Sequence, residues 1–532
     1  MPLFRKIHIK NFHMYAVILL VFIFQYINSD YGNKVNDFPY LQNSTIETSD
    51  IGNAMSRNAV NGYDVRSENV SKWLMRFRLY SIEADEMLNI MALGRIKPSK
   101  LEFDPHYYAY GGAYLYPLGA WYAMLKKIGV IKVGDLKWMI DHSDEMENIY
   151  HYGRVFVLFS FVLSALLMFY TLKSFSSLKF SFLATTIYLI MPINIMFSII
   201  MKPYVYSLLW VNLSLFILSI AWSKKKLTTG LSLATGVSLG MAVGSVIING
   251  LFAVIVWLII VYFSIHSKIN ISKVFIIPIV AILVFFITNP YIFINYDAYV
   301  EELSRQSNWF FIGMQPKFVM DFVSNSVIPG FGIAFTALML YALLSSIFTS
   351  SHVINKIVSY SIVAIIVFIS LISASISEWH INARYVLYFI PIIFILFSFS
   401  LNRNKIRVLK VVLFVTLIQS APLFIAYIDE DSYEHSTRIK SAEWINNQNM
   451  LVCPHGEIAP YDTPPFDFLS LFSDKDNCQL VVKIDRQPDI AKDEKPGLYL
   501  VKRFEPRLNF SNIPVIYSHI NPQISIFKKY EK

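Results

Sequence analysis

The chain has 532 residues, of which 55% are hydrophobic and only 16% are charged, with a formal net charge of +9. Soluble domains contain about 25% charged residues, so this composition excludes an ordinary soluble protein and predicts several membrane spans. The positive charge lies mainly in short segments beside the apolar runs. It therefore reports membrane topology and gives no reason to expect a nucleic-acid partner.

The first apolar run extends from about Met14 to Ile27 and follows a basic N-terminus. This pattern is typical of a signal peptide or of a first membrane helix. The residues after Ile27 lack the small-residue pattern of a cleavage site, so we predict an uncleaved first helix. The segment that follows, 29–150, is long and polar, and we interpret it as a large first outer loop.

Residues 80–122 of this loop combine charge with many aromatic side chains. Asp85 and Glu86 are adjacent in a predicted helix over 81–94, and Asn89 lies on the same face as Asp85. His106 and a series of tyrosines follow, and polar groups so close to hydrocarbon are usually functional. The alternative is a solvated interfacial helix with an aromatic belt. The aromatic series consists of Tyr107, Tyr108, Tyr110, Tyr114, Tyr116 and Trp121.

Ten more apolar segments bring the predicted number of membrane helices to about eleven, since each approaches the length needed to cross a bilayer. The fold class is therefore a polytopic α-helical membrane protein. The ten segments are 154–173, 180–200, 203–222, 229–246, 249–266, 274–289, 329–349, 357–376, 385–401 and 408–427.

Basic residues predict the topology, because cytoplasmic loops are enriched in Lys and Arg. With the N-terminus inside, the inner segments hold fifteen basic residues and the short outer loops hold four. This predicts a multi-pass protein of the plasma or inner membrane, with a cytoplasmic N-terminus and an exported C-terminus. The fifteen are Arg5, Lys6, Lys10, Lys173, Lys179, Lys224, Lys225, Lys226, Lys268, Lys273, Lys356, Arg403, Lys405, Arg407 and Lys410, and the four are Lys202, Arg305, Lys317 and Arg384.

The tail, 429–532, changes character and predicts a small exported α/β domain beside the membrane domain, 1–428. Cys453 and Cys478 both lie in it, and on the oxidising side of a membrane they are expected to form a disulfide, the alternative being two buried free thiols. The predicted elements are an amphipathic helix at 437–447 and strands at 480–484, 497–501, 515–519 and 523–527.

The sequence contains no P-loop, no dinucleotide fingerprint and no metal-ligand spacing of Cys and His. Instead, the topology places several cations on the side of Asp85 and Glu86. Arg154 begins the second predicted span, Lys202 lies between the third and fourth, and Arg384 begins the tenth, near Glu378 and His380. Cations at helix ends usually reach the headgroups. Together with a carboxylate pair, they suit an anionic phosphate ligand and a general base.

The order of these features resembles the GT-C superfamily of polyprenyl-phosphate-sugar-dependent glycosyltransferases, nearest the protein O-mannosyltransferase-like branch. One departure is Tyr204, which stands where many relatives have an acidic residue. The motifs that carry the resemblance are Asp85-Glu86, P-H-x-x-x-Y-G-G-x-Y-x-Y at 105–116, Tyr152-Gly153-Arg154, Met201-Lys202-Pro203, Thr288-Asn289-Pro290-Tyr291, Ala383-Arg384-Tyr385 and, in the tail, Arg438-x-x-x-Ala442-x-Trp444-Ile445.

The resemblance implies an inverting transfer of a hexosyl or pentosyl group from a polyprenyl-phosphate-linked sugar to a glycan, lipid or protein acceptor. Asp85 would be the general base, with Glu86 beside it in the catalytic pair. No cofactor would be required, although Asp85 and Glu86 could bind a divalent cation. Membrane lipids would be the other partners. The donor phosphate would contact Arg154, Lys202 and Arg384, and the substrate would be oriented by His106, Tyr107, Tyr110 and Tyr385.

Two other functions are compatible with the sequence. The first is a secondary transporter or a flippase for lipid-linked oligosaccharides, although such proteins usually carry ionisable groups within their spans and often contain inverted repeats. The second is a non-catalytic polysaccharide-export or assembly subunit that shares only the fold.

Overall fold

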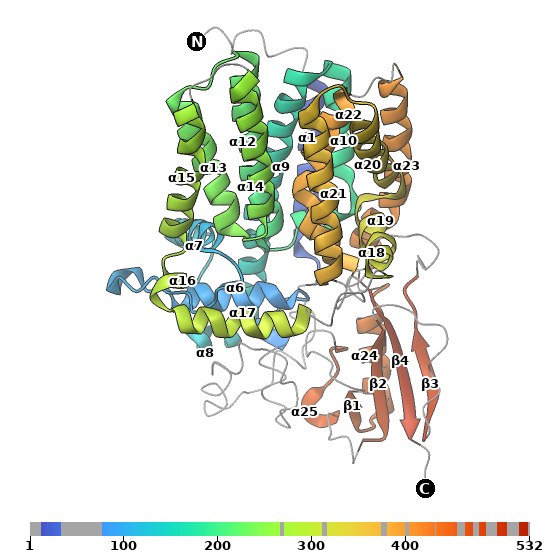
Figure 1. Ribbon diagram of the computed structural model, residues 1–532. Helices are drawn as coiled ribbons and strands as arrows, with labels where there is room; N and C mark the ends of the chain where they lie inside the picture. The colour runs from blue at the N-terminus through green and yellow to red at the C-terminus, as the bar shows by residue number, and fades with distance from the viewer. Residues whose placement is uncertain are drawn as a thin grey trace.

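The computed structural model contains a bundle of long helices and, at one end of it, a small domain built on a β-sheet (Figure 1). The residues that it describes are 12–32, 77–266, 271–310, 317–373, 380–399, 404–430, 432, 434–454, 463–471, 478–485, 497–507 and 521–529.

Within the described residues, seven helices are long and apolar enough to cross a membrane. Two bent helix pairs raise this number to nine, with bends of 62° and 113°. The seven are α1 (Phe12–Ile27), α9 (Ser143–Phe175), α12 (Pro203–Ser223), α14 (Asn249–His266), α15 (Ile271–Thr288), α21 (Val353–Ser373) and α23 (Lys405–Ile425), and the pairs join α10 (Leu178–Ile190) to α11 (Pro192–Ser198), and α18 (Lys317–Phe322), η4 (Val323–Val327) and α19 (Ile328–Phe331) to α20 (Ile333–Phe348).

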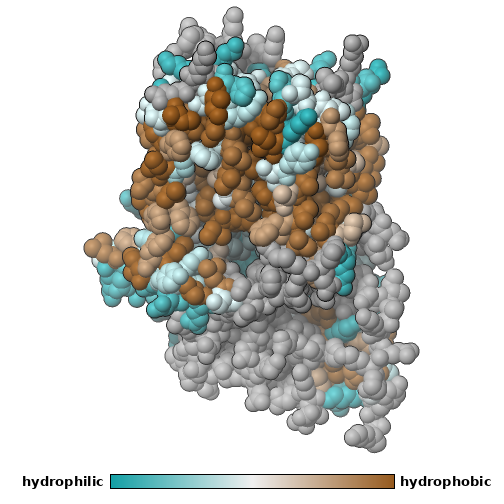
Figure 2. Space-filling view, viewed as in Figure 1, coloured by the Kyte–Doolittle hydropathy of each residue, from teal (hydrophilic) through white to brown (hydrophobic). Residues whose placement is uncertain are grey.

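The two remaining predicted spans also coincide with helices, but shorter ones. They are α13 (Thr229–Ser245) and the run formed by η6 (His380–Phe389) and α22 (Ile390–Phe399). The class of polytopic helical membrane protein is thus confirmed. Figure 2 shows an apolar band across the visible face of the bundle, as expected where lipid chains contact the protein.

The end of the bundle that faces the small domain is covered by helices that do not span it (Figure 1). The predicted helix over 81–94 is confirmed as α6, which occupies Ala84–Arg95. The other elements of this layer are η1 (Asn28–Asp30), η3 (Pro98–Lys100), α7 (Gly112–Lys127), α8 (Leu136–Asp141), α16 (Tyr291–Ile294) and α17 (Tyr296–Phe310).

The C-terminal domain contains a four-stranded mixed sheet in the order β1-β2-β4-β3, in which only β1 and β2 are parallel. The helix predicted at 437–447 and three of the four predicted strands are confirmed; the strand predicted at 515–519 lies outside the described residues. The elements are η7 (Ala426–Glu430), α24 (Thr437–Gln448), β1 (Val452–Pro454), α25 (Phe468–Leu471), β2 (Leu480–Asp485), β3 (Leu498–Phe504) and β4 (Gln523–Lys529).

The predicted disulfide between Cys453 and Cys478 is confirmed, with the two Cα atoms 5.6 Å apart. It joins β1 to the residues that lead into β2. The core of this domain also receives Phe77 from the segment that precedes α6, and the Phe77 ring lies 5.8 Å from that of Phe468. Because Phe77 precedes α6 by a few residues, the C-terminal domain is tied directly to the helix that carries Asp85.

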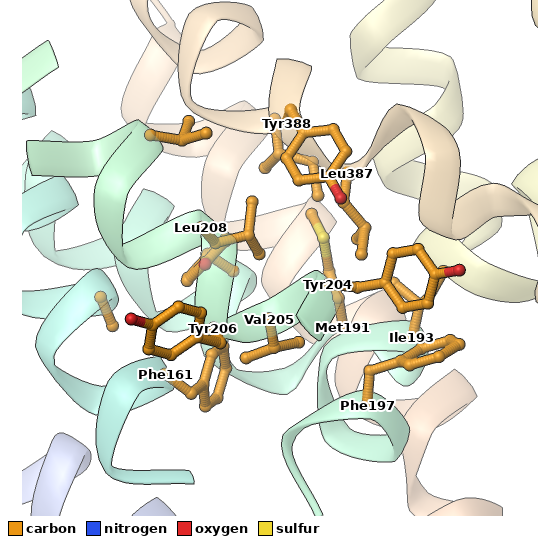
Figure 3. Close-up of a cluster of buried hydrophobic side chains, with 14 of the residues drawn as sticks. Phe161, Met191, Ile193, Phe197, Tyr204, Val205, Tyr206, Leu208, Leu387 and Tyr388 are labelled. Atoms are coloured by element: carbon orange, nitrogen blue, oxygen red, sulfur yellow. The ribbon is translucent and has the colours of Figure 1, made fainter. Parts of the chain in front are cut away.

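A buried apolar cluster gathers side chains from α9, α11, α12 and η6 (Figure 3). Phe197 and Tyr204 meet edge to face, with ring centroids 5.7 Å apart, and Leu387 and Tyr388 come from η6. Close packing of this kind restricts the backbone. The cluster therefore fixes the chain segments that carry Lys202 and Arg384.

Candidate functional site

Glu86 and Arg154 form a fully buried ion pair. Arg154 donates from Nε to Glu86 Oε1 at 3.0 Å and from Nη2 to Glu86 Oε2 at 2.8 Å, and neither side chain has any exposed surface. The geometry is bidentate, the strongest arrangement for these two groups. Ser81 also donates to Glu86 Oε2, at 2.5 Å.

Arg154 has its other hydrogen-bond partners inside the protein as well. Its Nη1 donates to the carbonyl oxygens of Ser29 and Tyr31 at 2.8 and 2.9 Å, and the guanidinium lies 4.5 Å from the centre of the Tyr31 ring. The sequence suggested that Arg154 begins a span, but α9 starts eleven residues earlier, at Ser143. The side chain thus lies about three turns inside the helix, in protein rather than at its surface.

Glu86 and Asn89 together hold the backbone of Met201, the residue that precedes Lys202. Met201 donates its backbone N–H to Glu86 Oε1 at 2.7 Å, and Asn89 donates its amide to the Met201 carbonyl, also at 2.7 Å. Residues three apart on a helix share a face, which explains how both reach the backbone of one residue. The predicted acidic pair therefore contains one residue, Glu86, that positions the chain around Lys202.

Lys202 lies between two carboxylates at the start of α6. Its Nζ is 3.1 Å from Asp85 Oδ2 and 3.3 Å from Glu83 Oε2. The lysine side chain is only 5% exposed, whereas that of Asp85 is 36% exposed. Asp85 is thus the accessible member of the group. Glu83 was not singled out from the sequence; its spacing of two from Asp85 at a helix start was the available signal.

The ionisation of Asp85 is governed by the cations around it. Burial alone favours the neutral acid, but the positive charges of Lys202 and Arg384 outweigh it, so the pKa of Asp85 lies below its ordinary value. Tyr110 adds to this effect by donating its hydroxyl to Asp85 Oδ2 at 3.2 Å. Asp85 is therefore a carboxylate at neutral pH.

Arg384 reaches the same place from η6 and is held by aromatic rings. Its guanidinium carbon lies 4.8 Å from the centre of the Tyr204 ring and 4.9 Å from that of Tyr385, and Nη2 donates to the Tyr385 hydroxyl at 2.9 Å. Among the described residues it has no carboxylate partner, and its Nε is buried without a hydrogen bond. A guanidinium in this state offers free donors to an anion.

Tyr204, the residue at which the chain departs from the GT-C pattern, helps to build this arrangement. Its ring lies 6.2 Å from that of Tyr110 and 6.1 Å from that of Tyr385, edge to face in both cases. The Tyr204 ring therefore packs between two residues of the site: Tyr110, which donates a hydrogen bond to Asp85, and Arg384 of η6. An aromatic face beside a guanidinium also contributes a cation–π attraction.

The loop before α7 is held by residues from the distant α16–α17 region. Glu302 accepts the backbone N–H groups of Tyr108 and Ala109 at 2.9 and 3.1 Å, and Asn289 accepts that of Gly112 at 2.8 Å. At Gly111 a Cβ atom would lie 1.7 Å from the Gly244 carbonyl oxygen, so only glycine fits. These contacts place Tyr110 beside Asp85.

His106 lies on the outer side of this loop, away from the buried pair. It has a left-handed backbone with φ of 47°, its Nδ1 is 3.4 Å from Asp104 Oδ2, and its carbonyl accepts from Arg95 at 3.0 Å. It borders an open cavity of about 750 Å³ whose other walls are Arg95 and residues 294–298. Tyr107 is buried against Tyr110, with ring centroids 5.6 Å apart.

The arrangement of Asp85 and Glu86 does not favour a shared cation. Asp85 faces Lys202, while both Glu86 oxygens accept hydrogen bonds from protein donors. No group of three or more His, Cys, Asp and Glu side chains that could hold a metal occurs in the part of the chain described here. We therefore assign no chemical step to a metal at this pair.

The structure thus brings Asp85, Lys202, Arg384, Tyr110 and Tyr385 together. The buried pair of Arg154 and Glu86 supports them through the backbone of Met201, next to Lys202. Tyr107 and His106 lie in the adjoining loop. Glu378 and the side chain of His380 lie outside the described residues.

No protein-family model and no curated protein sequence matches the chain. Among solved structures, the chain is similar to ArnT from Cupriavidus metallidurans in the apo state, with a TM-score of 0.43 and 10% identity over 96% of this chain and 97% of that one. It is also similar to the same protein bound to undecaprenyl phosphate, with a TM-score of 0.42 and 12% identity over 90% and 98%. We transfer no functional residue from these weak likenesses.

Proposed function

We propose that this protein is a membrane glycosyltransferase that moves a sugar from a polyprenyl-phosphate donor to an acceptor hydroxyl. The observation that carries the proposal is the pairing of one accessible carboxylate, Asp85, with two cations, Lys202 and Arg384, at the end of a membrane bundle. The motifs shared with the GT-C superfamily agree with it. A lipid-linked phosphate can enter such a site from the bilayer while the acceptor arrives from the aqueous side.

In the proposed reaction, Asp85 takes the proton of the acceptor hydroxyl, and the oxygen attacks the anomeric carbon from the face opposite the phosphate. The bond between that carbon and the phosphate oxygen breaks, and polyprenyl phosphate leaves with the bonding electrons. Lys202 and Arg384 stabilise the negative charge that develops on the phosphate. A single displacement of this kind inverts the anomeric configuration.

Donor binding would also adjust the base. In the structure Lys202 forms ion pairs with Asp85 and Glu83. A phosphate that binds Lys202 and Arg384 shares their positive charge, so the pKa of Asp85 rises from its lowered value. Asp85 then becomes a stronger base only when the donor is present. Arg154 and Glu86 act as positioning residues in this scheme, since Glu86 accepts the backbone N–H of Met201, next to Lys202, and Arg154 holds Glu86 in place.

The test uses the detergent-purified full chain with polyprenyl-phosphate sugars and an acceptor extract. Binding of polyprenyl phosphate should weaken roughly 10- to 150-fold in Arg384→Met, because charge-assisted hydrogen bonds contribute about 1.5–3 kcal/mol. The matched control is Arg407→Met, an exposed arginine at the start of α23. Equal binding by both variants would remove Arg384 from the site. Absence of transfer by the wild type across several donors would favour the transporter or flippase.

A further inference from the structure

A second cavity lies between α1, α9, α10 and α23 and has a different chemistry. Its volume is about 440 Å³, within the range of roughly 300–1,000 Å³ that is usual for ligand sites. Three basic side chains border an otherwise apolar wall. The basic side chains are His13, Lys179 and Lys410, and the apolar wall includes Phe169, Phe182 and Leu183.

The cavity is remote from the candidate active site. Phe169 follows Arg154 by fifteen residues on the continuous helix α9, which corresponds to about 22 Å along its axis. The contact between Phe175 and Trp222, with ring centroids 6.2 Å apart, places the C-terminal ends of α9 and α12 together at this end of the bundle. Lys202 and Arg154 belong to the opposite end.

The basic side chains of the cavity have no acidic neighbour on the helices that form it. Helices α1, α10 and α23 contain no Asp or Glu, and the carboxylates of α9 lie in its first two turns, at the other end. Across the described ranges, His13, Lys179 and Lys410 form no ion pair. Basic residues at helix ends often only reach the headgroup region; here they surround a cavity with an apolar wall.

We propose that this cavity binds an anionic glycerophospholipid. Lys179 and Lys410 contact the phosphate, His13 lies at the same rim, and an acyl chain lies along Phe169, Phe182 and Leu183. Basic pockets between membrane helices bind anionic lipid headgroups in this way, and each Lys near an anionic headgroup contributes about 1 kcal/mol. The ligand has both parts that the cavity complements, a negative head and an apolar chain.

The test measures retention of dioleoyl phosphatidylglycerol by the full-length protein in detergent, using native mass spectrometry. The double variant Lys179→Gln/Lys410→Gln should retain the lipid about 25-fold more weakly, since each lysine accounts for roughly fivefold. Both lysines are exposed, so folding should be unchanged, and an unchanged thermal midpoint checks this. The control is Lys224→Gln/Lys226→Gln, which removes the same charge from an exposed turn after α12.

Two further arms identify the ligand. Dioleoyl phosphatidylcholine tests the need for net negative charge, and glycerol 3-phosphate tests the need for the acyl chains; neither should compete at the concentrations at which phosphatidylglycerol binds. Equal retention by the two double variants would overturn the proposal. Effective competition by glycerol 3-phosphate would identify a site for free phosphate anions, and competition by phosphatidylcholine would identify a purely apolar site.

Discussion

Asp85 and Glu86 are neighbours in the sequence, and each faces a cation, yet the structure gives the two pairs opposite surroundings. The pair of Glu86 and Arg154 has no exposed surface, and both side chains also form hydrogen bonds to Ser81, Met201 and the carbonyl oxygens of Ser29 and Tyr31. The pair of Asp85 and Lys202 leaves 36% of the Asp85 side chain exposed. Successive residues on a helix point about 100° apart, so one turn of α6 can carry both the buried Glu86 and the accessible Asp85.

This difference gives the buried pair a structural role and leaves the accessible carboxylate, Asp85, for the proposed chemistry. A buried ion pair gains little net stability when it is intact, but removal of one partner leaves an uncompensated charge. An accessible carboxylate can exchange its partner for a substrate. We therefore expect substitutions in the buried pair to damage the fold, and substitution of the accessible Asp85 to damage transfer much more than the fold.

The largest expected effect on transfer comes from Asp85→Asn. The amide keeps the size of the side chain but lacks the basic lone pair, so the rate should fall about 10²- to 10⁴-fold. The thermal midpoint should fall only slightly, because Glu83 still pairs with the buried Lys202. The control is Asp144→Asn at the exposed start of α9, which should transfer normally. Equal transfer by Asp85→Asn and the wild type would exclude Asp85 as the base.

Arg154→Met should act on stability instead. Loss of the guanidinium leaves Glu86 buried and unpaired, which costs about 3–5 kcal/mol, so the thermal midpoint and the yield of monodisperse protein should both fall. The double variant Glu86→Gln/Arg154→Met should be more stable than the sum of the single effects predicts, since no lone charge remains. A normal thermal midpoint combined with lost transfer would show that Arg154 acts on the donor phosphate, as the sequence predicts, and not on the stability of the fold.

The fold and most of the site could be predicted because their signals are local. Apolar runs predicted the eleven helical segments, and short β-favouring stretches between turn residues predicted β2, β3 and β4. The location of Cys453 and Cys478 on the expected oxidising side of the membrane predicted their disulfide. Strand β1 was missed because three residues are too few to show alternation. Arg154 was placed at a helix end because the polar first turns of α9 do not resemble a membrane span.

The long-range polar contacts could not be predicted. Glu302 is 194 residues from Tyr108, and nothing in its local sequence indicates that it accepts two backbone N–H groups of the loop before α7. Glu83 was overlooked for a related reason, since its importance depends on Lys202, which is 119 residues away. Such pairs are decided by packing, after the helices have formed.

Glu302→Gln tests how far the accessible site depends on this distant support. The variant keeps one acceptor oxygen and loses the other, which should weaken the hold on the loop by about 1.5 kcal/mol and lower transfer roughly tenfold. The matched control is its neighbour Glu301→Gln, which is exposed and should behave as the wild type. If both variants transfer alike, α17 does not position the loop.

The smallest expected effect is a change of pH dependence in Tyr110→Phe. The Tyr110 hydroxyl donates to the ionised Asp85 and helps to lower its pKa, so its removal should raise that pKa. Transfer needs ionised Asp85, and the acidic limb of its pH profile should therefore move to higher pH. The bond contributes about 1 kcal/mol of stability that is present above the ordinary pKa of Asp and is lost as pH falls through the lowered pKa.

Tyr114→Phe is the control, because its hydroxyl is buried and has no hydrogen-bond partner among the described residues. A shift of the acidic limb in both variants would mean that the tyrosine packing, rather than the bond to Asp85, sets the pH dependence.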